Sequence, residues 1–137
     1  MGILIDTSVL VALERSGVSA AAVPVGLRDE RAFLAAITAS ELLHGVHRAD
    51  GAARRARRSA FVEALLDLLP VLSFDLTAAR VHAGLWAELR ERGEMIGSHD
   101  LLIAATALAG GLVLLTHNTR EFGRIVGLRL ERWAPTG

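Results

Sequence analysis

Short runs of large aliphatic residues, each followed by a segment of helical character, constrain the fold of this chain most strongly. Such runs are too apolar for half-exposed strands and are typical of strands buried on both faces of a parallel sheet. Four buried strands are predicted: Ile3–Ile5, Phe33–Ile37, Val71–Phe74 and Leu112–Leu115. A fifth segment, Leu128–Glu131, alternates apolar and charged residues and is predicted to be a short edge strand.

The segments between these strands have the length and spacing of helices. Helices are predicted over 9–13, 42–46, 52–69, 76–92 and 98–109, whereas Ser16–Pro24 is predicted to be a loop with a short helical turn. Alternation of strands and helices is typical of a three-layer α/β/α sandwich around a mainly parallel central sheet. A length of 137 residues fits a single domain that spans residues 1–137.

The composition excludes several classes of protein. A hydrophobic content of 52% argues against disorder, and the lack of cysteine excludes disulfides and thiolate metal sites. The formal net charge of zero argues against a protein held on nucleic acid by bulk electrostatics. No apolar run approaches the roughly 18 residues of a membrane span. The start of the chain also has no signal-peptide layout, so a soluble cytoplasmic protein is expected.

Acidic residues stand where predicted strands end or a buried helix begins. Asp6 follows the first strand directly, Glu41 comes shortly after the second, and Asp100 lies in the first turn of an apolar helix. Each has a simpler explanation as a helix cap. Asp is a preferred N-cap residue, Thr38-x-x-Glu41 fits a capping box, and Ser98 or Asp100 would cap the helix at 98–109. Asp75 offers only such a capping position and is interpreted as structural.

The joint placement of the acids favours chemistry over separate caps. In a parallel sheet the carboxyl ends of the strands meet at one edge, where ligands bind. Asp6, Glu41 and the segment 116–121 are therefore expected at that edge, with Asp100 close by. Clustered carboxylates repel one another unless a cation lies among them. Oxygen ligands without cysteine suit Mg²⁺ or Mn²⁺, which in such sites activates water for phosphodiester hydrolysis.

Four motifs, in this order, resemble those of PIN-domain ribonucleases, and specifically the VapC-type toxins of bacterial type II toxin–antitoxin pairs. They are ILIDTS at 3–8, TASEL at 38–42, GSHDLLIAA at 97–105 and LLTHNTREF at 114–122. Each motif alone is weak, but four at these separations span nearly the whole chain and make a specific signal. The resemblance implies a PIN-like fold and a metal-dependent endoribonuclease that hydrolyses RNA phosphodiester bonds.

The resemblance also assigns residues and partners. It implies that Asp6, Glu41 and Asp100 are catalytic, metal-binding carboxylates, and that Thr7, Ser98 and Thr116 support the site. It further implies Mg²⁺ or Mn²⁺ as cofactor, structured RNA as substrate, a homodimer, and inhibition by a small antitoxin that inserts into the active-site groove. Many members carry a fourth Asp where this chain has Asn118, so Asn118 and Glu121 are candidates for a second metal position.

The predicted helix at 52–69 carries a cluster of arginines in its first half and an apolar second half. The apolar half favours a subunit interface or an embedded helix. The simplest interpretation of the arginine cluster is a helix end exposed to solvent. Because the net charge is zero, the cluster is also the densest local patch that could contact RNA phosphates or an acidic antitoxin tail. Its members are Arg54, Arg55, Arg57 and Arg58.

Two other functional classes remain open at this stage. A small α/β phosphatase or phospho-acceptor also uses an Asp after its first strand. However, Ser8 stands where the usual second acid would be, and the chain contains no lysine for a receiver-type site. The other class is a PIN fold that has lost activity and serves as a binding module, which Asn118 keeps open.

Overall fold

A five-stranded, entirely parallel sheet forms the centre of the protein. The computed structural model describes residues 2–23 and 31–133. The strands lie in the order β3-β2-β1-β4-β5, so that the first strand of the chain is the middle one. Every neighbouring pair is parallel. The strands are β1 (Gly2–Ile5), β2 (Arg31–Ala35), β3 (Val71–Leu72), β4 (Val113–Thr116) and β5 (Leu130–Arg132).

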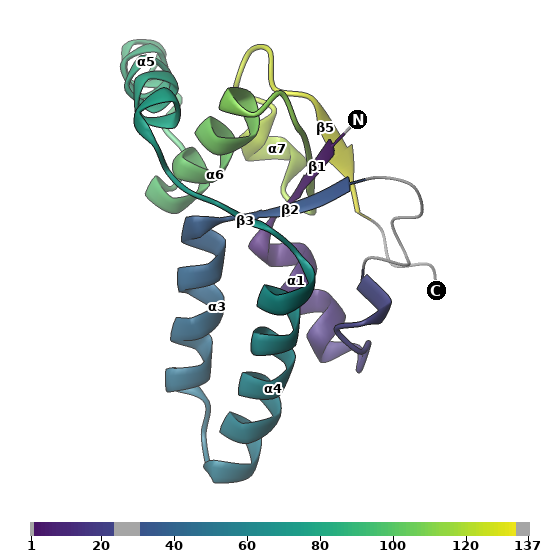
Figure 1. Cartoon of the computed structure of the whole chain (residues 1–137). Coiled ribbons are helices and arrows are strands. Elements are labelled where there is room, and N and C mark those ends of the chain that lie inside the picture. Colours follow the sequence, from purple (N-terminus) through teal and green to yellow (C-terminus); the bar gives the residue numbers. More distant parts are fainter. Residues whose placement is uncertain (1, 24–30, 134–137) are drawn as a thin grey trace.

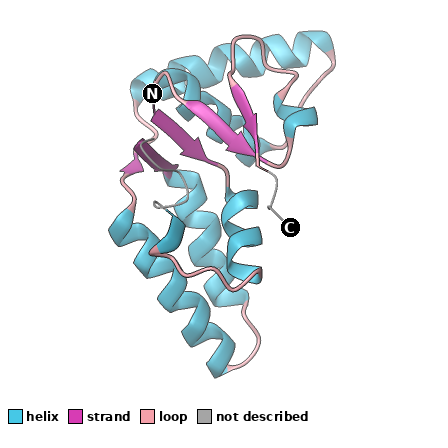
Figure 2. Ribbon diagram, turned by 90° about the vertical axis from the view of Figure 1, so that its right-hand side faces the viewer, coloured by secondary structure: helices cyan, strands magenta, loops and turns pink. Residues whose placement is uncertain are grey.

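Helices cover both faces of this sheet (Figures 1 and 2). One face is covered by α1 (Thr7–Arg15), α3 (Ala36–Arg48) and α4 (Ala52–Leu68). The opposite face is covered by α5 (Leu76–Arg92), α6 (Ser98–Ala109) and α7 (Thr119–Phe122). Figure 1 shows α3 and α4 running side by side away from the sheet as a long pair. The predicted three-layer α/β/α sandwich is therefore confirmed.

The central strand contributes to the apolar core on both of its faces. Leu4 packs into the cluster beneath α5 and α6, whereas Ile3 and Ile5 pack into the cluster beneath α1, α3 and α4. Leu114 and Leu115 of β4 divide in the same way. Because alternate residues of a strand point to opposite faces, an unbroken aliphatic run is what a doubly covered strand requires.

The second strand ends earlier than the sequence predicts. β2 covers Arg31–Ala35, and α3 begins at Ala36 with Ala35 as its N-cap, without a side-chain capping bond. The interpretation of Thr38 and Glu41 as a capping box is therefore wrong. Thr38 is fully buried, and Glu41 lies in the second turn of the helix. Ala35 and Ala36 favour helix, whereas Ile37 favours strand, so the apolar run 33–37 does not mark this boundary clearly.

The smaller elements also differ slightly from the predictions. β3 is only two residues long, and the edge strand β5 begins at Leu130, two residues later than predicted. Residues 16–23 are mainly turns, and the end of the predicted loop, at Pro24, lies outside the described residues. Helix α6 spans Ser98–Ala109, as predicted. No helix in the described part of the chain is both long and apolar enough to cross a membrane.

The apolar half of α4 is embedded in the protein. Val62, Leu65 and Leu69 are buried in the cluster shared with α1 and α3, which accounts for most of its apolar stripe. Leu68, which points away from that cluster, is 47% exposed. Of the two interpretations of this helix, packing within the chain is the one that the structure confirms.

We expect Asp75→Ala to lower the free energy of unfolding by about 1 kcal/mol, the usual value of an N-cap. Asp75 is the N-cap of α5, and its carboxylate accepts a hydrogen bond of 2.9 Å from the Ala78 backbone N–H, which confirms its structural role. Urea denaturation of both proteins measures the difference. Asp67→Ala, at an exposed position of α4, is the matched control. A loss no larger than the control's would contradict the capping role.

Candidate active site

Asp6 lies directly at the carboxyl end of the central strand. It is 4% exposed, and its Oδ2 atom accepts hydrogen bonds of 2.7 Å from both Ser8 Oγ and Thr116 Oγ1. Asp6 occupies the N-cap position of α1 but makes no side-chain capping bond. The carboxylate is thus held by two hydroxyls from α1 and β4, and helix capping does not explain it.

Glu41 reaches the same edge of the sheet from α3. Its Oε1 atom lies 2.8 Å from the Thr7 hydroxyl, and that hydroxyl lies 3.0 Å from Thr38 Oγ1. A hydroxyl has only one proton, so donation to the carboxylate leaves Thr38 to donate to Thr7. The other oxygen of Glu41, Oε2, lies 3.4 Å from His99 Nδ1 on α6. Residues of three helices therefore fix the orientation of this carboxylate.

Asp100 lies in the first turn of α6, and neither it nor Ser98 caps the helix. The N-cap is Gly97, without a side-chain capping bond. A Cβ atom on Gly97 would lie 3.4 Å from Asp100 Oδ2, which is ordinary van der Waals contact, so the carboxylate packs close to this glycine. Burial, followed in order of effect by the negative charges of Asp6, Glu121 and Glu41, raises the pKa of Asp100 from 3.8 to about 6. His99 opposes the shift only in part.

The repulsion felt by Asp100 shows that four carboxylates face one region. Asp6, Glu41 and Asp100 were predicted to converge, and Glu121 of α7 joins them. Thr116 connects this group to the segment after β4, because its hydroxyl donates to Asp6 and accepts a 2.9 Å hydrogen bond from the Asn118 backbone N–H. Asn118 is the N-cap of α7 by position but makes no side-chain capping bond.

The donor set of this region fits a hard divalent cation. It consists of carboxylate oxygens surrounded by hydroxyls, which are the ligands that Mg²⁺ and Mn²⁺ prefer. A cation would also relieve the repulsion that, after burial, contributes to the raised pKa of Asp100. Across residues 2–23 and 31–133, no three acidic or histidine side chains already stand at the spacing of a metal site.

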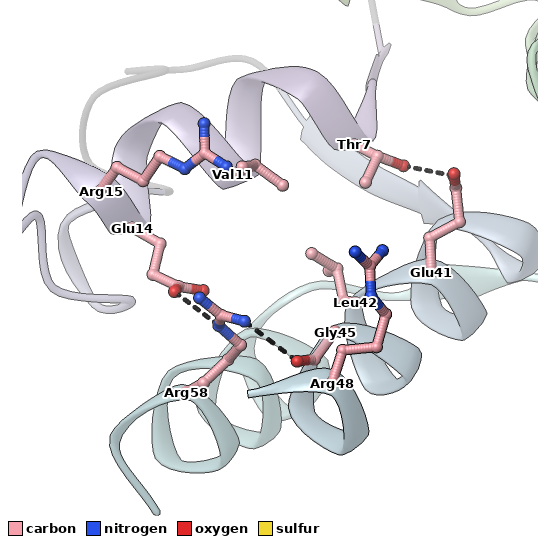
Figure 3. Close-up of a pocket in the computed structure, with 9 residues that line it drawn as sticks. All are labelled: Thr7, Val11, Glu14, Arg15, Glu41, Leu42, Gly45, Arg48 and Arg58. Atoms are coloured by element: carbon pink, nitrogen blue, oxygen red, sulfur yellow. Dashed lines mark hydrogen bonds and ion pairs between the residues drawn. The ribbon is translucent and has the colours of Figure 1, made fainter. Parts of the chain in front are cut away.

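A hollow of about 310 Å³ opens beside Glu41, between α1 and the α3–α4 pair (Figure 3). Thr7 and Glu41 line one end, and the walls carry Arg15, Arg48 and Arg58. We call this space the arginine hollow. Figure 3 shows it bounded by α1 on one side and by α3 and α4 on the other. The groove next to the acids is therefore basic along its walls.

The arginines predicted to contact RNA or an antitoxin differ in their surroundings. Arg58 bonds Glu14 Oε1 and the Gly45 carbonyl, both at 3.0 Å, so it joins α4 to α1 and α3. Arg55 donates to the Ala49 carbonyl at 3.3 Å. Arg54 and Arg57 are exposed and line a neighbouring hollow. The prediction of an external contact is not tested by this geometry, but Arg58 has a clear structural role.

Of the three residues predicted to support the site, two contact the acids and one does not. Thr7 and Thr116 bond directly to the acids. Ser98 is exposed and lines a different hollow together with His82, Trp86 and Met95.

Several residues of the site were not predicted to belong to it. Ser8 donates to Asp6, Thr38 contacts the Thr7 hydroxyl that donates to Glu41, and His99 contacts Glu41 directly. Ser8 had a sequence signal, because it follows Asp6 by two residues in the same motif. Thr38 was hidden by its apparent capping role. Arg15 had no local signal at all, since only the packing of α1 against α3 brings it to the hollow.

The sequence profile of the PIN domain matches residues 3–128 of the chain. Among similar proteins, Ribonuclease VapC1 of Rickettsia felis is 38% identical over 130 residues, which is 95% of each chain. The tRNA(fMet)-specific endonuclease VapC of Salmonella typhimurium is 40% identical over 108 residues, covering 78% of this chain and 79% of the relative.

Solved structures agree with this sequence similarity. The DNA-bound VapBC structure from Salmonella typhimurium aligns with a TM-score of 0.86 and 31% identity, covering 98% of this chain and 99% of the other. VapBC2 from Rickettsia felis, bound to a DNA fragment from its promoter, aligns with a TM-score of 0.87 and 26% identity, covering 98% and 100%. The chain therefore belongs to the PIN domain family, among its members of the VapC type.

Proposed function

We propose that this protein is a divalent-metal-dependent endoribonuclease, the toxin of a toxin–antitoxin pair. The observation that carries the proposal is the convergence of Asp6, Glu41, Asp100 and Glu121 at one sheet edge. Its support is the similarity, at 30–40% identity, to proteins described as ribonucleases and as tRNA(fMet)-specific endonucleases. Its substrate is RNA, and it acts in the cytoplasm.

In the proposed mechanism, the residues of the chain act mainly by holding charge in place. Asp6, Glu41 and Asp100 would hold Mg²⁺ or Mn²⁺, which when bound supplies Lewis-acid stabilisation of the phosphate and activation of water. Ser8 and Thr116 keep Asp6 oriented, and Thr7 keeps Glu41 oriented. Ligands whose orientation is fixed by surrounding hydrogen bonds lose little freedom when they bind a cation.

The partner of the toxin is a small antitoxin protein. Support comes from a structural relative at 31% identity and a TM-score of 0.72, described as a member of the VapBC family of toxin–antitoxin systems from Mycobacterium tuberculosis. A homodimer, and the antitoxin's insertion into the active-site groove, are part of the same proposal. Size-exclusion chromatography with light scattering tests the homodimer, and co-purification of a co-expressed candidate antitoxin tests the antitoxin.

The test of the function is cleavage of total RNA by the purified protein, with Mg²⁺ or Mn²⁺ and with EDTA. New RNA ends are expected only with the metals, and mapping those ends identifies the target. If the protein binds RNA but forms no metal-dependent ends, it is instead the inactive PIN-fold binding module that the presence of Asn118 kept open as an alternative. Release of inorganic phosphate from phosphomonoesters would instead favour the phosphatase alternative.

We expect Glu121→Gln to weaken Mn²⁺ binding and Asn118→Asp to strengthen it, each by about tenfold. Glu121 repels Asp100 and therefore faces the acids, whereas the Asn118 side chain makes no capping bond. A carboxylate binds a hard cation more tightly than a neutral amide does. Isothermal titration calorimetry measures all three proteins, with Glu131→Gln, exposed on β5, as the control. Indistinguishable titrations would place both residues outside the metal site.

We expect Thr38→Val to lower kcat for RNA cleavage by about tenfold, and Thr38→Ser to restore most of it. Valine keeps the buried volume but removes the hydroxyl that contacts Thr7, which in turn orients Glu41. Thr106→Val is the control, because Thr106 is also buried but its hydroxyl donates only to the Leu102 carbonyl. Equal effects of the two valine substitutions would assign Thr38 to stability alone.

A further inference from the structure

Arg15 and Arg48 have no hydrogen-bond or ion-pair partner among residues 2–23 and 31–133. In the described part of the chain, neither side chain makes a hydrogen bond or an ion pair, and both are exposed. Arg58 differs, since its charge is offset by Glu14. Figure 3 shows Arg15 on α1 and Arg48 on α3 at the border of the arginine hollow. Two guanidinium groups on facing walls thus remain available for a ligand.

The arginine hollow continues into a second hollow along α4. The second hollow has a volume of about 670 Å³ and shares Glu14, Arg15 and Arg58 with the first. Arg54 and Arg57 add positive charge there, without a further acid. The two hollows form a path that starts at Glu41 and becomes more basic away from it. A ligand of the path must therefore suit both a divalent cation at the acids and guanidinium groups further along.

An RNA strand meets both requirements with a single repeating group. One phosphate lies at the bond to be cut, and the next phosphates of the backbone fall among the arginines, which bind phosphate bidentately. An acidic peptide would satisfy the arginines but would bring its carboxylates next to Glu41. The chain has zero net charge, so local contacts of this kind must supply the attraction for RNA.

We propose that Arg15 and Arg48 form a phosphate-binding subsite that holds the RNA backbone next to the bond that is cut. The subsite rests on the proposed function, because it requires an RNA strand whose phosphate lies at the acids. Its two arginines come from α1 and α3, the helices that also present Thr7 and Glu41. The strand is thereby oriented by the same elements that orient a catalytic carboxylate.

The test compares two double variants for RNA binding. Arg15→Gln with Arg48→Gln removes the subsite, whereas Arg80→Gln with Arg90→Gln removes two exposed charges from α5, on the other face of the sheet. Both are made in Asp6→Asn protein so that the RNA stays intact. Binding of a short, fluorescently labelled single-stranded RNA of mixed sequence is measured by anisotropy at several NaCl concentrations.

Loss of the subsite should weaken RNA binding by roughly tenfold. It should also flatten the slope of the logarithm of the binding constant against the logarithm of the NaCl concentration (the salt slope) by about 1.4, which is about 0.7 for each of two phosphate contacts. The α5 variant should change neither by that much. An unchanged salt slope, or equal changes in both variants, overturns the inference. It is also overturned if the binding of an oligoglutamate peptide, and not the binding of RNA, depends on Arg15 and Arg48. The proposed function fails separately, if protein with an intact Asp6 forms no metal-dependent RNA ends.

Discussion

Replacing Asp6 by Asn should lower the rate of RNA cleavage by on the order of 10³-fold without unfolding the protein. The Oδ2 atom of Asp6 accepts two hydroxyl hydrogen bonds, from Ser8 and Thr116. The amide oxygen of Asn can accept both of them, so the local structure is preserved while the negative charge is lost. A cation held by the carboxylates loses its most buried ligand.

Single-turnover cleavage of a mapped RNA site measures this effect, and thermal unfolding followed by circular dichroism checks the fold. Asp67→Asn, at an exposed position of α4, is the matched control for loss of one acid. Near-normal cleavage by the folded Asp6→Asn protein would remove Asp6 from the metal site and leave it a structural residue at the end of β1.

Asp100→Asn should also abolish cleavage, but it should make the metal-free protein more stable by about 1 kcal/mol at neutral pH. The pKa of Asp100 is raised from 3.8 to about 6 by burial and by the neighbouring acids. The folded chain therefore holds this proton more tightly than the unfolded chain. The contribution of this proton to the free energy of unfolding is fully present below about pH 4. It is lost as the pH rises to about 6, and it stays lost at higher pH.

Thermal unfolding in EDTA, near pH 4 and near pH 8, compares the stability of the wild-type protein with that of Asp100→Asn. The melting temperature of the wild-type protein should fall relative to that of Asp100→Asn as the pH rises. Adding Mn²⁺ should restore the wild-type protein only, because the cation replaces the repulsion with attraction. If the two proteins show the same pH dependence, Asp100 carries no electrostatic strain and is not part of the acidic cluster.

The sheet and its helices were predictable because each strand is defined by its own residues. Unbroken aliphatic runs such as Ile3–Ile5 are needed wherever both faces of a strand are covered. Helix α6 was predicted residue for residue, since a glycine pair follows it and a polar turn precedes it. The start of α3 was missed, because the apolar run 33–37 was predicted as one strand although Ala35 and Ala36 favour helix and only Ile37 favours strand.

The position of the acids could be predicted from the topology of the sheet. The residues that hydrogen-bond to them could not. Parallel strands bring their carboxyl ends to one edge, so Asp6 and Glu41 could be placed together before any contact was known. The bond between Thr7 and Glu41 depends instead on how closely α1 approaches α3, across a separation of 34 residues. Arg15 and Arg48 depend on the same approach, and no local pattern marks them.

The position of β1 in the middle of the sheet has a consequence for the order in which the protein is made. The ribosome synthesises β1 well before β4, which is one of its two neighbours in the sheet. The hydrogen bond from Thr116 to Asp6 spans 110 residues. A nascent chain that ends before β4 leaves one edge of β1 unpaired and Asp6 without this support. The surroundings of Asp6 are therefore complete only after β4 has been synthesised and has paired with β1.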